Sequence, residues 1–301
     1  MDERKIIALG FFDGVHLGHQ ALLRECCALA RREGCEAAAI TFDRHPRSLF
    51  TANPPELLST EQERKMLLSR YGMAAVYSYS VTAETMATPW EKFLEDLVAL
   101  GAVGFVCGTD FRFGHKGEGN TDKLLQFCDQ RNLPCIIVPE QTMDGIRISS
   151  THIRGLLALG HMETATRFLG HPHILSGEVV TGRKLGNKLG FPTANILIPE
   201  GVTCPRHGVY ACKALVDGES YLAVTNVGSR PTVEGHQVRT ESWILDFAGN
   251  LYGKTVTLEF HYFLRPEKRF ASLEQLTQAV KADAARTRDY FREKLKNASL
   301  S

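Results

Sequence analysis

The chain has 301 residues, of which 44% are hydrophobic and 23% charged, the balance of an ordinary folded protein rather than of a disordered chain. Domains usually hold about 100–150 residues, so the length favours two domains. The 35 basic and 34 acidic side chains give a net charge of +1, which excludes a general electrostatic attraction to nucleic acid or to an anionic membrane. Phosphate chemistry would therefore need a local site.

No run of about 18 or more uncharged apolar residues occurs, so the sequence predicts no membrane-spanning segment. Residues 1–14 lack the pattern of a secretory signal. The eight cysteines include no CxxC pair, and most of them lie in apolar runs. We therefore expect reduced, buried thiols in a cytoplasmic protein.

In the first half of the chain, short apolar runs typical of strands alternate with runs of helical periodicity. Strands are expected at residues 5–9, 36–42, 74–80, 103–107 and 135–138. Helices are expected around residues 22–30 and 93–98, and over 60–71 and 121–131. This alternation predicts a doubly wound α/β domain, in which ligands bind beyond the carboxyl ends of the strands. The loops after Leu9, Phe42 and Cys107 would then form the binding edge.

From about His173 the pattern changes to short strands that Gly, Asp and Pro turns separate. Strands are expected at residues 209–216, 221–226, 243–247 and 256–262, and their spacing predicts a small antiparallel β-barrel. A closing helix follows, from about Leu273 to Leu295. A linker with a short helical piece is expected at 160–172. Because the pattern changes at about His173, we expect domains at 1–172 and 173–301.

The segment Gly10-Phe-Phe-Asp-Gly-Val-His-Leu-Gly-His19 follows the first strand and opens the first helix. Its two histidines, His16 and His19, are three residues apart and share one helix face. A helix N-terminus offers unpaired N–H groups and a positive dipole end, and Gly14 and Gly18 allow close backbone approach. The pattern favours a polyphosphate site, although a lone histidine here would more often be structural.

This segment resembles the HxGH signature of the nucleotidylyltransferase superfamily. In its longer form it is similar to the adenylyltransferase half of the prokaryotic bifunctional riboflavin kinase/FAD synthetase family. The same resemblance continues, in order, through Thr41–Pro46, Gly108–Gly114 and Ser149–Arg154. The last segment also has a physical rationale, because Ser149 or Ser150 can cap a helix whose N-terminus binds phosphate. A plain loop turn or helix cap is the alternative for each motif taken singly.

The resemblance implies a nucleotidylyltransferase (Rossmann-like) fold and assigns roles to individual residues. His16 and His19 would contact the transferred α-phosphate and the leaving pyrophosphate. Asp110 and Phe111 would lie at the nucleotide or flavin. The implied contacts to the ATP phosphates are Gly10, Phe12, Asp13, Gly14, Gly18, Ser150, Thr151 and Arg154.

A second motif runs from Gly182 to Asn195 and joins a basic, glycine-rich loop to a rigid Gly-Phe-Pro-Thr-Ala-Asn turn. Its glycines can expose N–H groups to phosphates, and lysines such as Lys184 can add charge. Thr193 and Asn195 lie two residues apart, so on an extended segment they share a face and could hold one Mg²⁺. A mobile hairpin tip with solvated lysines is the alternative.

The turn is similar to the PTAN motif of riboflavin kinases, and the segments beginning at Asn226, Thr240, Leu251 and Arg265 continue the resemblance. By resemblance, Glu241 is the general base on the terminal ribityl hydroxyl of the flavin, a role that suits a carboxylate beside the γ-phosphate. Where the family commonly has histidine two residues later, this chain has Trp243. The further implied contacts are Gly182, Lys184 and Gly190 to ATP and Arg265 to the flavin.

The resemblance, which covers residues 6 to about 283, therefore predicts a bifunctional transferase. Riboflavin and ATP would give FMN in the C-terminal domain, and FMN and ATP would give FAD and pyrophosphate in the N-terminal domain, with Mg²⁺ as cofactor and flavin-requiring apoproteins as recipients. Three alternatives remain at this stage: an enzyme with one working half, a flavin- or nucleotide-binding regulator, and a transferase that uses another nucleotide or acceptor.

Overall fold

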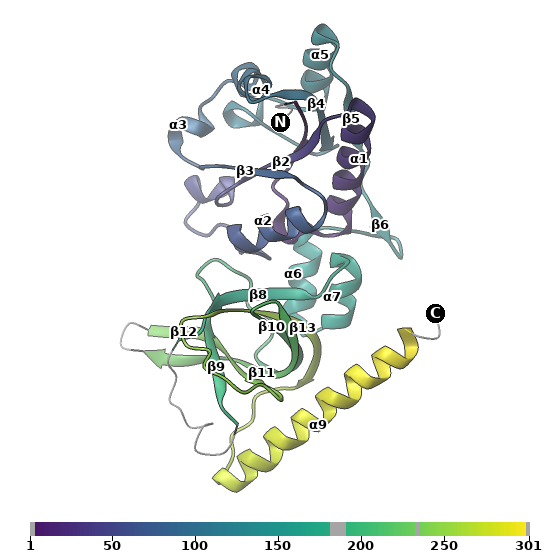
Figure 1. Cartoon of the computed structure of the whole chain (residues 1–301). Helices are drawn as coiled ribbons and strands as arrows, with labels where there is room; N and C mark the ends of the chain where they lie inside the picture. The colour runs from purple at the N-terminus through teal and green to yellow at the C-terminus, as the bar shows by residue number, and fades with distance from the viewer. Residues whose placement is uncertain (1–3, 181–190, 233–234, 299–301) are drawn as a thin grey trace. The chain divides into compact units, whose positions relative to one another are not determined.

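The computed structural model of the chain describes residues 4–180, 191–232 and 235–298 (Figure 1). It consists of two compact units, Met1–His152 and Ile153–Ser301. The expected order is confirmed, because the N-terminal unit is an α/β domain with a parallel sheet and the C-terminal unit is a curled antiparallel sheet with a long final helix. The predicted domain boundary at 172/173 stays a prediction.

The N-terminal unit is built on five parallel strands in the order β3-β2-β1-β4-β5. The strands are β1 (Lys5–Leu9), β2 (Glu36–Phe42), β3 (Ala75–Tyr79), β4 (Ala102–Gly108) and β5 (Cys135–Val138). Strand β1 lies between β2 and β4 and is almost wholly buried, as its continuous apolar run predicts. The loops after β1, β2 and β4 therefore leave the sheet from three neighbouring strands at one edge.

Helices cover both faces of this sheet. They are α1 (Leu17–Glu33), α2 (Glu61–Arg70), α3 (Ala83–Met86), α4 (Trp90–Ala99) and α5 (Thr121–Arg131). Ile7 and Leu9 share one core cluster with Phe93 of α4 and Phe127 of α5. On the other face, the Cys26 thiol of α1 lies 3.4 Å from the Ile6 carbonyl oxygen. The alternate residues of β1 thus bury opposite faces of the sheet, as strand geometry requires.

Local signals set the ends of these helices. Gly34 closes α1 in a left-handed conformation with φ 65°, which glycine adopts without strain. Thr60 opens α2 through a capping box with Glu63, and Pro89 precedes α4. A two-stranded hairpin of β6 (Thr142–Met143) and β7 (Ile146–Arg147), which the sequence analysis did not predict, ends the unit.

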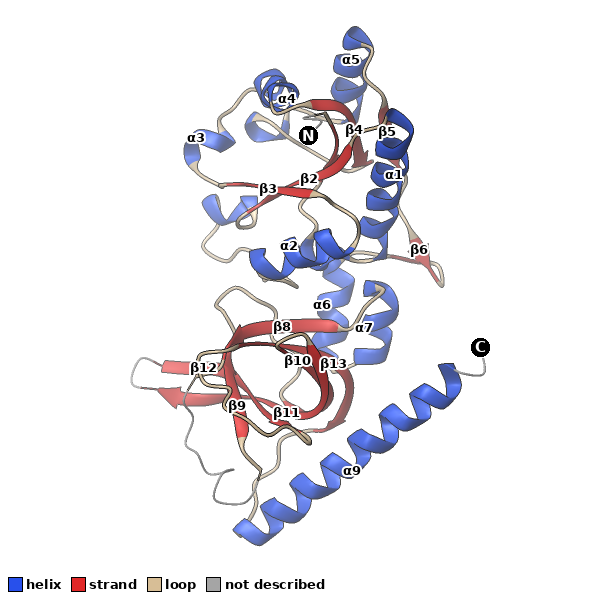
Figure 2. Cartoon of the chain, viewed as in Figure 1, coloured by secondary structure: helices blue, strands red, loops and turns tan. Residues whose placement is uncertain are grey.

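Six antiparallel strands form the sheet of the C-terminal unit, in the order β8-β13-β10-β11-β12-β9. The strands are β8 (His173–Glu178), β9 (Thr193–Leu197), β10 (Gly208–Val216), β11 (Glu219–Thr232), β12 (Gly235–Ile244) and β13 (Thr255–Arg265). Val180, just after β8, pairs with Asn195 of β9. The two edges of the sheet therefore meet, and Figure 2 shows the strands curled around a common axis.

Among the described residues, three helices accompany this sheet: α6 (Ser150–Leu159), which begins within the N-terminal unit, α7 (Met162–Leu169) and α9 (Leu273–Ala298). Helix α9 lies along the outside of the strands (Figure 2), and its Phe291 belongs to one hydrophobic core cluster with Ala211 and Leu264. None of the helices that the structure describes combines the length and apolar character needed to cross a lipid bilayer.

Two predicted strands were wrong in their bounds. The strand expected at 221–226 covers less than half of β11, which runs over Glu219–Thr232. The apolar segment 243–247 was expected to be a strand, but β12 runs over Gly235–Ile244 and the chain then turns. Asp246 adopts a left-handed conformation with φ 60°, and Arg288 of α9 binds its carboxylate at 2.8 and 2.9 Å. The chain therefore leaves the sheet at a left-handed residue, which the apolar run of this segment does not reveal.

Candidate functional site

The turn after β1 leaves the binding edge of the sheet in an unusual conformation. Phe12 and Val15 have φ values of 58° and 41°, and Gly14 has 69°. Positive φ in non-glycine residues costs free energy and clusters at functional sites. Gly10 is required beneath this turn, because a Cβ there would lie 2.9 Å from the buried Phe12 ring. The predicted segment therefore forms a compact, strained turn.

His16 and His19 stand together at the start of α1. Their rings are stacked, with centroids 3.6 Å apart and an interplanar angle of 13°. His16 caps the helix, since its Nδ1 accepts a hydrogen bond from the His19 N–H at 3.3 Å. The proton of a neutral His16 consequently belongs on Nε2, which can donate to a ligand. His16 therefore has the structural role of a helix cap, and both histidines also stand side by side as predicted.

The electrostatic surroundings keep His19 neutral. Burial lowers the pKa of His19 well below its usual range, and the positive charges of His16 and Arg64 lower it further. Its Nδ1 is buried and has no hydrogen-bond partner among the described residues. At neutral pH the His19 ring is therefore a neutral group with an unused polar atom.

The start of α6 lies against this turn. Ser149 caps the helix by accepting a hydrogen bond from the His152 N–H at 3.3 Å, which decides between the two serines proposed as the cap. The Ser150 hydroxyl donates to the Asp13 carbonyl oxygen at 3.2 Å. The structure thus brings Ser150 to the histidine turn, while Thr151 is exposed and Arg154 half-buried further along α6.

A buried polar network that the sequence analysis missed supports the turn from below. The Asp13 carboxylate accepts a hydrogen bond from the Leu58 N–H at 2.7 Å, and the Ser59 hydroxyl accepts one from the Gly14 N–H at 3.1 Å. Arg64 of α2, which has no exposed surface, donates to the carbonyl oxygens of Ser59 and Phe42. An arginine amid the buried positions of α2 was the available sequence signal, because an arginine is almost never fully buried without partners.

The loop after β4 presents the proposed flavin contacts. Asp110 is exposed and forms an ion pair with Arg147 of β7 at 2.7 Å, and Arg147 also binds Glu140 at 2.9 Å. Phe111 stacks on Phe113 with centroids 5.6 Å apart. Exposed ion pairs of this kind add little stability. The pairing with Arg147, which was not predicted, therefore orients Asp110 more than it stabilises the unit.

In the C-terminal unit, Glu241 occupies the middle of a polar row across three strands. It lies opposite Asn195 of β9 on one side and opposite Asn226 of β11 on the other. Directly opposed residues have Cβ atoms about 5 Å apart and point to the same face. The predicted base is therefore next to the predicted metal ligand, and Asn226 is an additional neighbour.

Thr193 and Asn195 both lie on β9, at alternate positions that share a face. The Asn195 Oδ1 atom is buried and accepts no hydrogen bond from any described residue. A buried oxygen without a donor suits a cation, and Mg²⁺ prefers oxygen ligands. Among the described residues no group of three His, Cys, Asp or Glu side chains is suited to a metal. The fit to Mg²⁺ therefore depends on the Thr193 and Asn195 oxygens.

Two further contacts shape this site. Trp243 lies opposite Thr193 in the register of β12 with β9, and its ring lies 5.6 Å from that of Phe191. Asn226 donates to Glu267 at 3.2 Å. Trp243 thus places an aromatic ring beside Phe191, where the resemblance led us to expect a histidine.

Arg265 is held by a carboxylate of the final helix. Its Nη2 lies 2.7 Å from Asp283, and its Nε binds both carboxylate oxygens at 3.1 Å. It therefore anchors α9, and its contact with the flavin stays a prediction. Gly182, Lys184 and Gly190 lie outside the described residues.

Comparisons with known proteins give a consistent result. A family model described as FAD synthetase matches residues 1–152, and one described as riboflavin kinase matches residues 169–291. A bifunctional riboflavin kinase/FMN adenylyltransferase of Listeria monocytogenes is 35% identical over 96% of this chain and 93% of its own length. Its counterpart in Escherichia coli is 36% identical over 95% of this chain and 92% of its own length.

A crystal structure described as a macrolide-efflux protein from Streptococcus pneumoniae is also similar. It has a TM-score of 0.83 and 30% sequence identity, and the match covers 95% of this chain and 94% of that one. Efflux is said of that protein alone. The likeness supports the architecture described above for both units.

Proposed function

The chain belongs to the bifunctional riboflavin kinase/FMN adenylyltransferase family, and on that premise we propose how its residues carry out the two reactions. The C-terminal part phosphorylates riboflavin to FMN with ATP, and the N-terminal part adenylylates FMN to FAD with release of pyrophosphate. The observation that carries this assignment is the match of two family models to successive segments of one chain.

For adenylyl transfer, we assign the reacting phosphates of ATP to the strained turn after β1. His16 and neutral His19 would donate hydrogen bonds to the α-phosphate and the leaving pyrophosphate, and Gly10, Phe12, Asp13, Gly14 and Gly18 would line the cradle. The stacked rings and the unused His19 Nδ1 support this assignment. An FMN phosphate oxygen is already a competent nucleophile, so positioning and charge stabilisation suffice.

The remaining contacts of this site follow from the helix start and the β4 loop. Ser150, Thr151 and Arg154 on α6 would hold the ATP phosphates, because a helix N-terminus and a guanidinium both favour anions. Asp110 and Phe111 would contact the flavin or the nucleotide. The hydrogen bond from Ser150 to the turn of the histidines supports the first of these roles.

For riboflavin phosphorylation, we propose Glu241 as the general base that takes the proton of the terminal ribityl hydroxyl. Its position opposite Asn195 supports this role, because a primary alcohol needs a positioned base beside the γ-phosphate. Thr193 and Asn195 would hold Mg²⁺, which would neutralise charge on the ATP phosphates. Gly182, Lys184 and Gly190 are the proposed phosphate contacts, and Arg265 the proposed flavin contact.

Three wider proposals accompany these roles. We place the domain boundary at 172/173, close to the start of the riboflavin kinase match at residue 169. We infer a cytoplasmic location, because all eight cysteines are free thiols and four of them are buried. Flavin-requiring apoproteins would receive the products.

Product analysis with two point variants tests these roles. The full-length chain, with Mg²⁺ and ATP, is given riboflavin in one assay and FMN in another. His19→Ala should slow FAD formation from FMN by about a hundredfold or more and leave FMN formation from riboflavin intact. Glu241→Ala should slow FMN formation by a similar factor and leave FAD formation from FMN intact. If either variant lost both activities equally, the assignment of the two sites would be wrong.

A further inference from the structure

The fully buried Arg64 has no role in the assignments above. Among the described residues, Arg64 has the largest fully buried side chain. A buried cation is costly unless its charge and its hydrogen-bond donors are matched by partners. It lies on the second turn of α2, whose N-terminus the Thr60 capping box already fixes. The helix therefore does not need this residue to form, and a hydrophobic side chain at this position would suit the core better.

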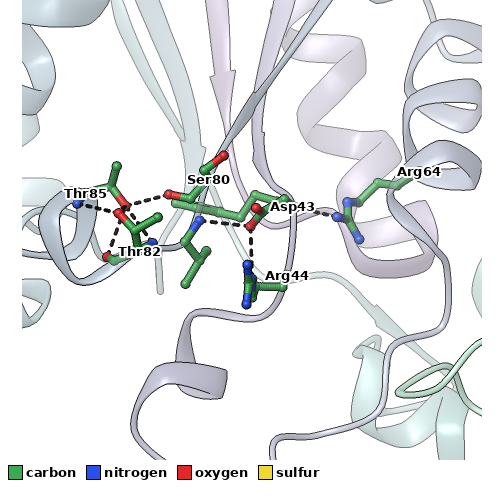
Figure 3. Close-up of polar contacts among 8 residues, drawn as sticks. Asp43, Arg44, Arg64, Ser80, Thr82 and Thr85 are labelled. Carbon is green, nitrogen blue, oxygen red and sulfur yellow. Dashed lines mark hydrogen bonds and ion pairs between the residues drawn. The ribbon is translucent and has the colours of Figure 1, made fainter.

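The contacts of Arg64 join three separate segments of the N-terminal unit. Its Nη2 donates to the carbonyl oxygen of Phe42 at the end of β2, and its Nη1 donates to that of Ser59 at 3.4 Å. Its guanidinium carbon lies 4.7 Å from the ring centre of Phe11, in the turn after β1. Figure 3 shows Arg64 reaching from α2 toward the end of β2, near Asp43.

Ser59 continues this connection to the histidine turn. Its carbonyl oxygen accepts from Arg64, while its hydroxyl accepts from the Gly14 N–H at 3.1 Å. Gly14 lies two residues before His16, which caps α1 and stacks on His19. A movement of Arg64 would therefore be transmitted through one residue to the turn that holds both rings.

We propose that Arg64 is a positioning residue for adenylyl transfer, which holds the His16–His19 turn in place and places a buried positive charge beside it. The proposal rests on the proposed function, because it takes the two histidines as the phosphate-handling groups. The Arg64 Nε is buried without a hydrogen-bond partner among the described residues. The guanidinium is thus not used up by its structural contacts.

The charge of Arg64 reaches His19. Burial lowers the pKa of His19 most, and the charges of His16 and Arg64 lower it further. Arg64 itself is surrounded by carboxylates from three segments, namely Asp13 of the turn, Asp43 after β2 and Glu61 and Glu63 of α2. Removal of the Arg64 charge should therefore raise the pKa of His19.

The test compares Arg64→Met and Arg64→Lys in the full-length chain, with FMN and ATP as substrates. We expect Arg64→Met to lower kcat for FAD formation roughly ten- to hundredfold, because small misplacements of reacting groups have effects of this size. KM for ATP should change far less. The acid limb of the pH profile should move to higher pH, since His19 would be protonated more readily, and Arg64→Lys should restore the original acid limb and part of kcat.

Two controls come from the same chain. FMN formation from riboflavin in the same preparation should stay unchanged, because it takes place in the other unit. Arg131→Met removes another arginine of the N-terminal unit that lies on an aromatic ring, 3.9 Å from the centre of Phe127, and it should leave FAD formation unaltered.

The proposal would be overturned if Arg64→Met kept kcat within about twofold, a change too small for loss of a positioning group. It would also be overturned if the variant lost activity without a shift of the acid limb.

If Arg64→Met does not fold, Ser59→Ala is the deciding variant, because it breaks the link to Gly14. It should lower kcat and leave the acid limb unchanged, and a wild-type kcat would reject the connection. His19→Ala is measured alongside: an active His19→Ala variant would reject the proposed site itself rather than the role of Arg64.

Discussion

Individual residues in this enzyme combine structural and chemical roles. His16 accepts the capping hydrogen bond of α1 through Nδ1, and this bond fixes which ring nitrogen can donate to a ligand. In the C-terminal unit, Asn195 pairs across the sheet through its backbone while its Oδ1 stays without a partner among the described residues. In the kinase site, the backbone contacts of Asn195 thus leave one polar atom of its side chain available for a ligand.

A buried histidine should control the acid stability of the C-terminal unit. Burial, with a contribution from the charge of His171, lowers the pKa of His173 to about 3. In the unfolded chain the pKa of a histidine is about 6.5. As the pH falls from about 6.5 toward 3, the unfolded state binds the proton that the folded state refuses, and the free energy of unfolding falls by about 1.4 kcal/mol per pH unit.

The measurement is urea unfolding as a function of pH, followed by the fluorescence of Trp243 in a Trp90→Phe background. Below about pH 6.5, His173→Phe should reduce the slope of the unfolding free energy against pH by the amount that corresponds to uptake of about one proton on unfolding. This holds whatever the variant's stability at neutral pH. An equal slope in both proteins would show that His173 is protonated in the folded state.

Strand β9 is the element on which the kinase site depends, because it carries both proposed metal ligands. Thr193→Val removes one oxygen at nearly constant volume, and we expect the Mg²⁺ concentration for half-maximal FMN formation to rise roughly ten- to hundredfold, as when a metal's coordination shell is disturbed. FAD formation from FMN should keep its own Mg²⁺ dependence.

A binding measurement accompanies this prediction. Trp243 lies opposite Thr193, so its fluorescence, again in a Trp90→Phe background, should respond to Mg²⁺ and ADP in the parent and respond weakly in Thr193→Val. Thr257→Val, on β13 of the same sheet, is the matched control and should titrate like the parent. Identical titrations for both valine variants would remove Thr193 from the metal site.

Helix α9 is held to the sheet by the ion pair of Arg265 with the buried Asp283. Arg265→Met leaves that carboxylate without its partner, and we expect the C-terminal unit to lose about 3 kcal/mol of stability. The double variant Arg265→Met/Asp283→Leu should recover most of this loss in thermal unfolding. If it also recovered FMN formation, Arg265 would be an anchor of α9 and not a flavin contact.

The sequence predicted elements well where local signals were strong. Continuous apolar runs located β1, β2 and β5 to the residue, and the helix expected over 121–131 matches α5. Strand β12 was misplaced because the apolar run 243–247 conceals the left-handed turn at Asp246. Arg64 was missed for a different reason: the sequence shows an arginine within a predicted helix, but only the fold brings its side chain to the turn after β1.

At the scale of the whole molecule, the thiols should fall into distinct classes of reactivity. Burial raises the pKa values of Cys26, Cys107 and Cys212 to about 12, and the thiolate is the reactive form. An aromatic disulfide reagent at pH 8 should therefore spare these three in the folded enzyme and modify all eight cysteines in urea. Mass mapping that found any of the three modified early would contradict the burial described here.

The central claim is that one chain carries two chemically separate sites, and a mixing experiment tests it most directly. His19→Ala and Glu241→Ala are supplied, alone and then together, with riboflavin, ATP and Mg²⁺, and FAD is measured by chromatography. Each variant alone should make no FAD, the first because it stops at FMN and the second because it makes none. The mixture should make FAD, because FMN released by one variant serves the other, and a mixture that yields none would contradict the account.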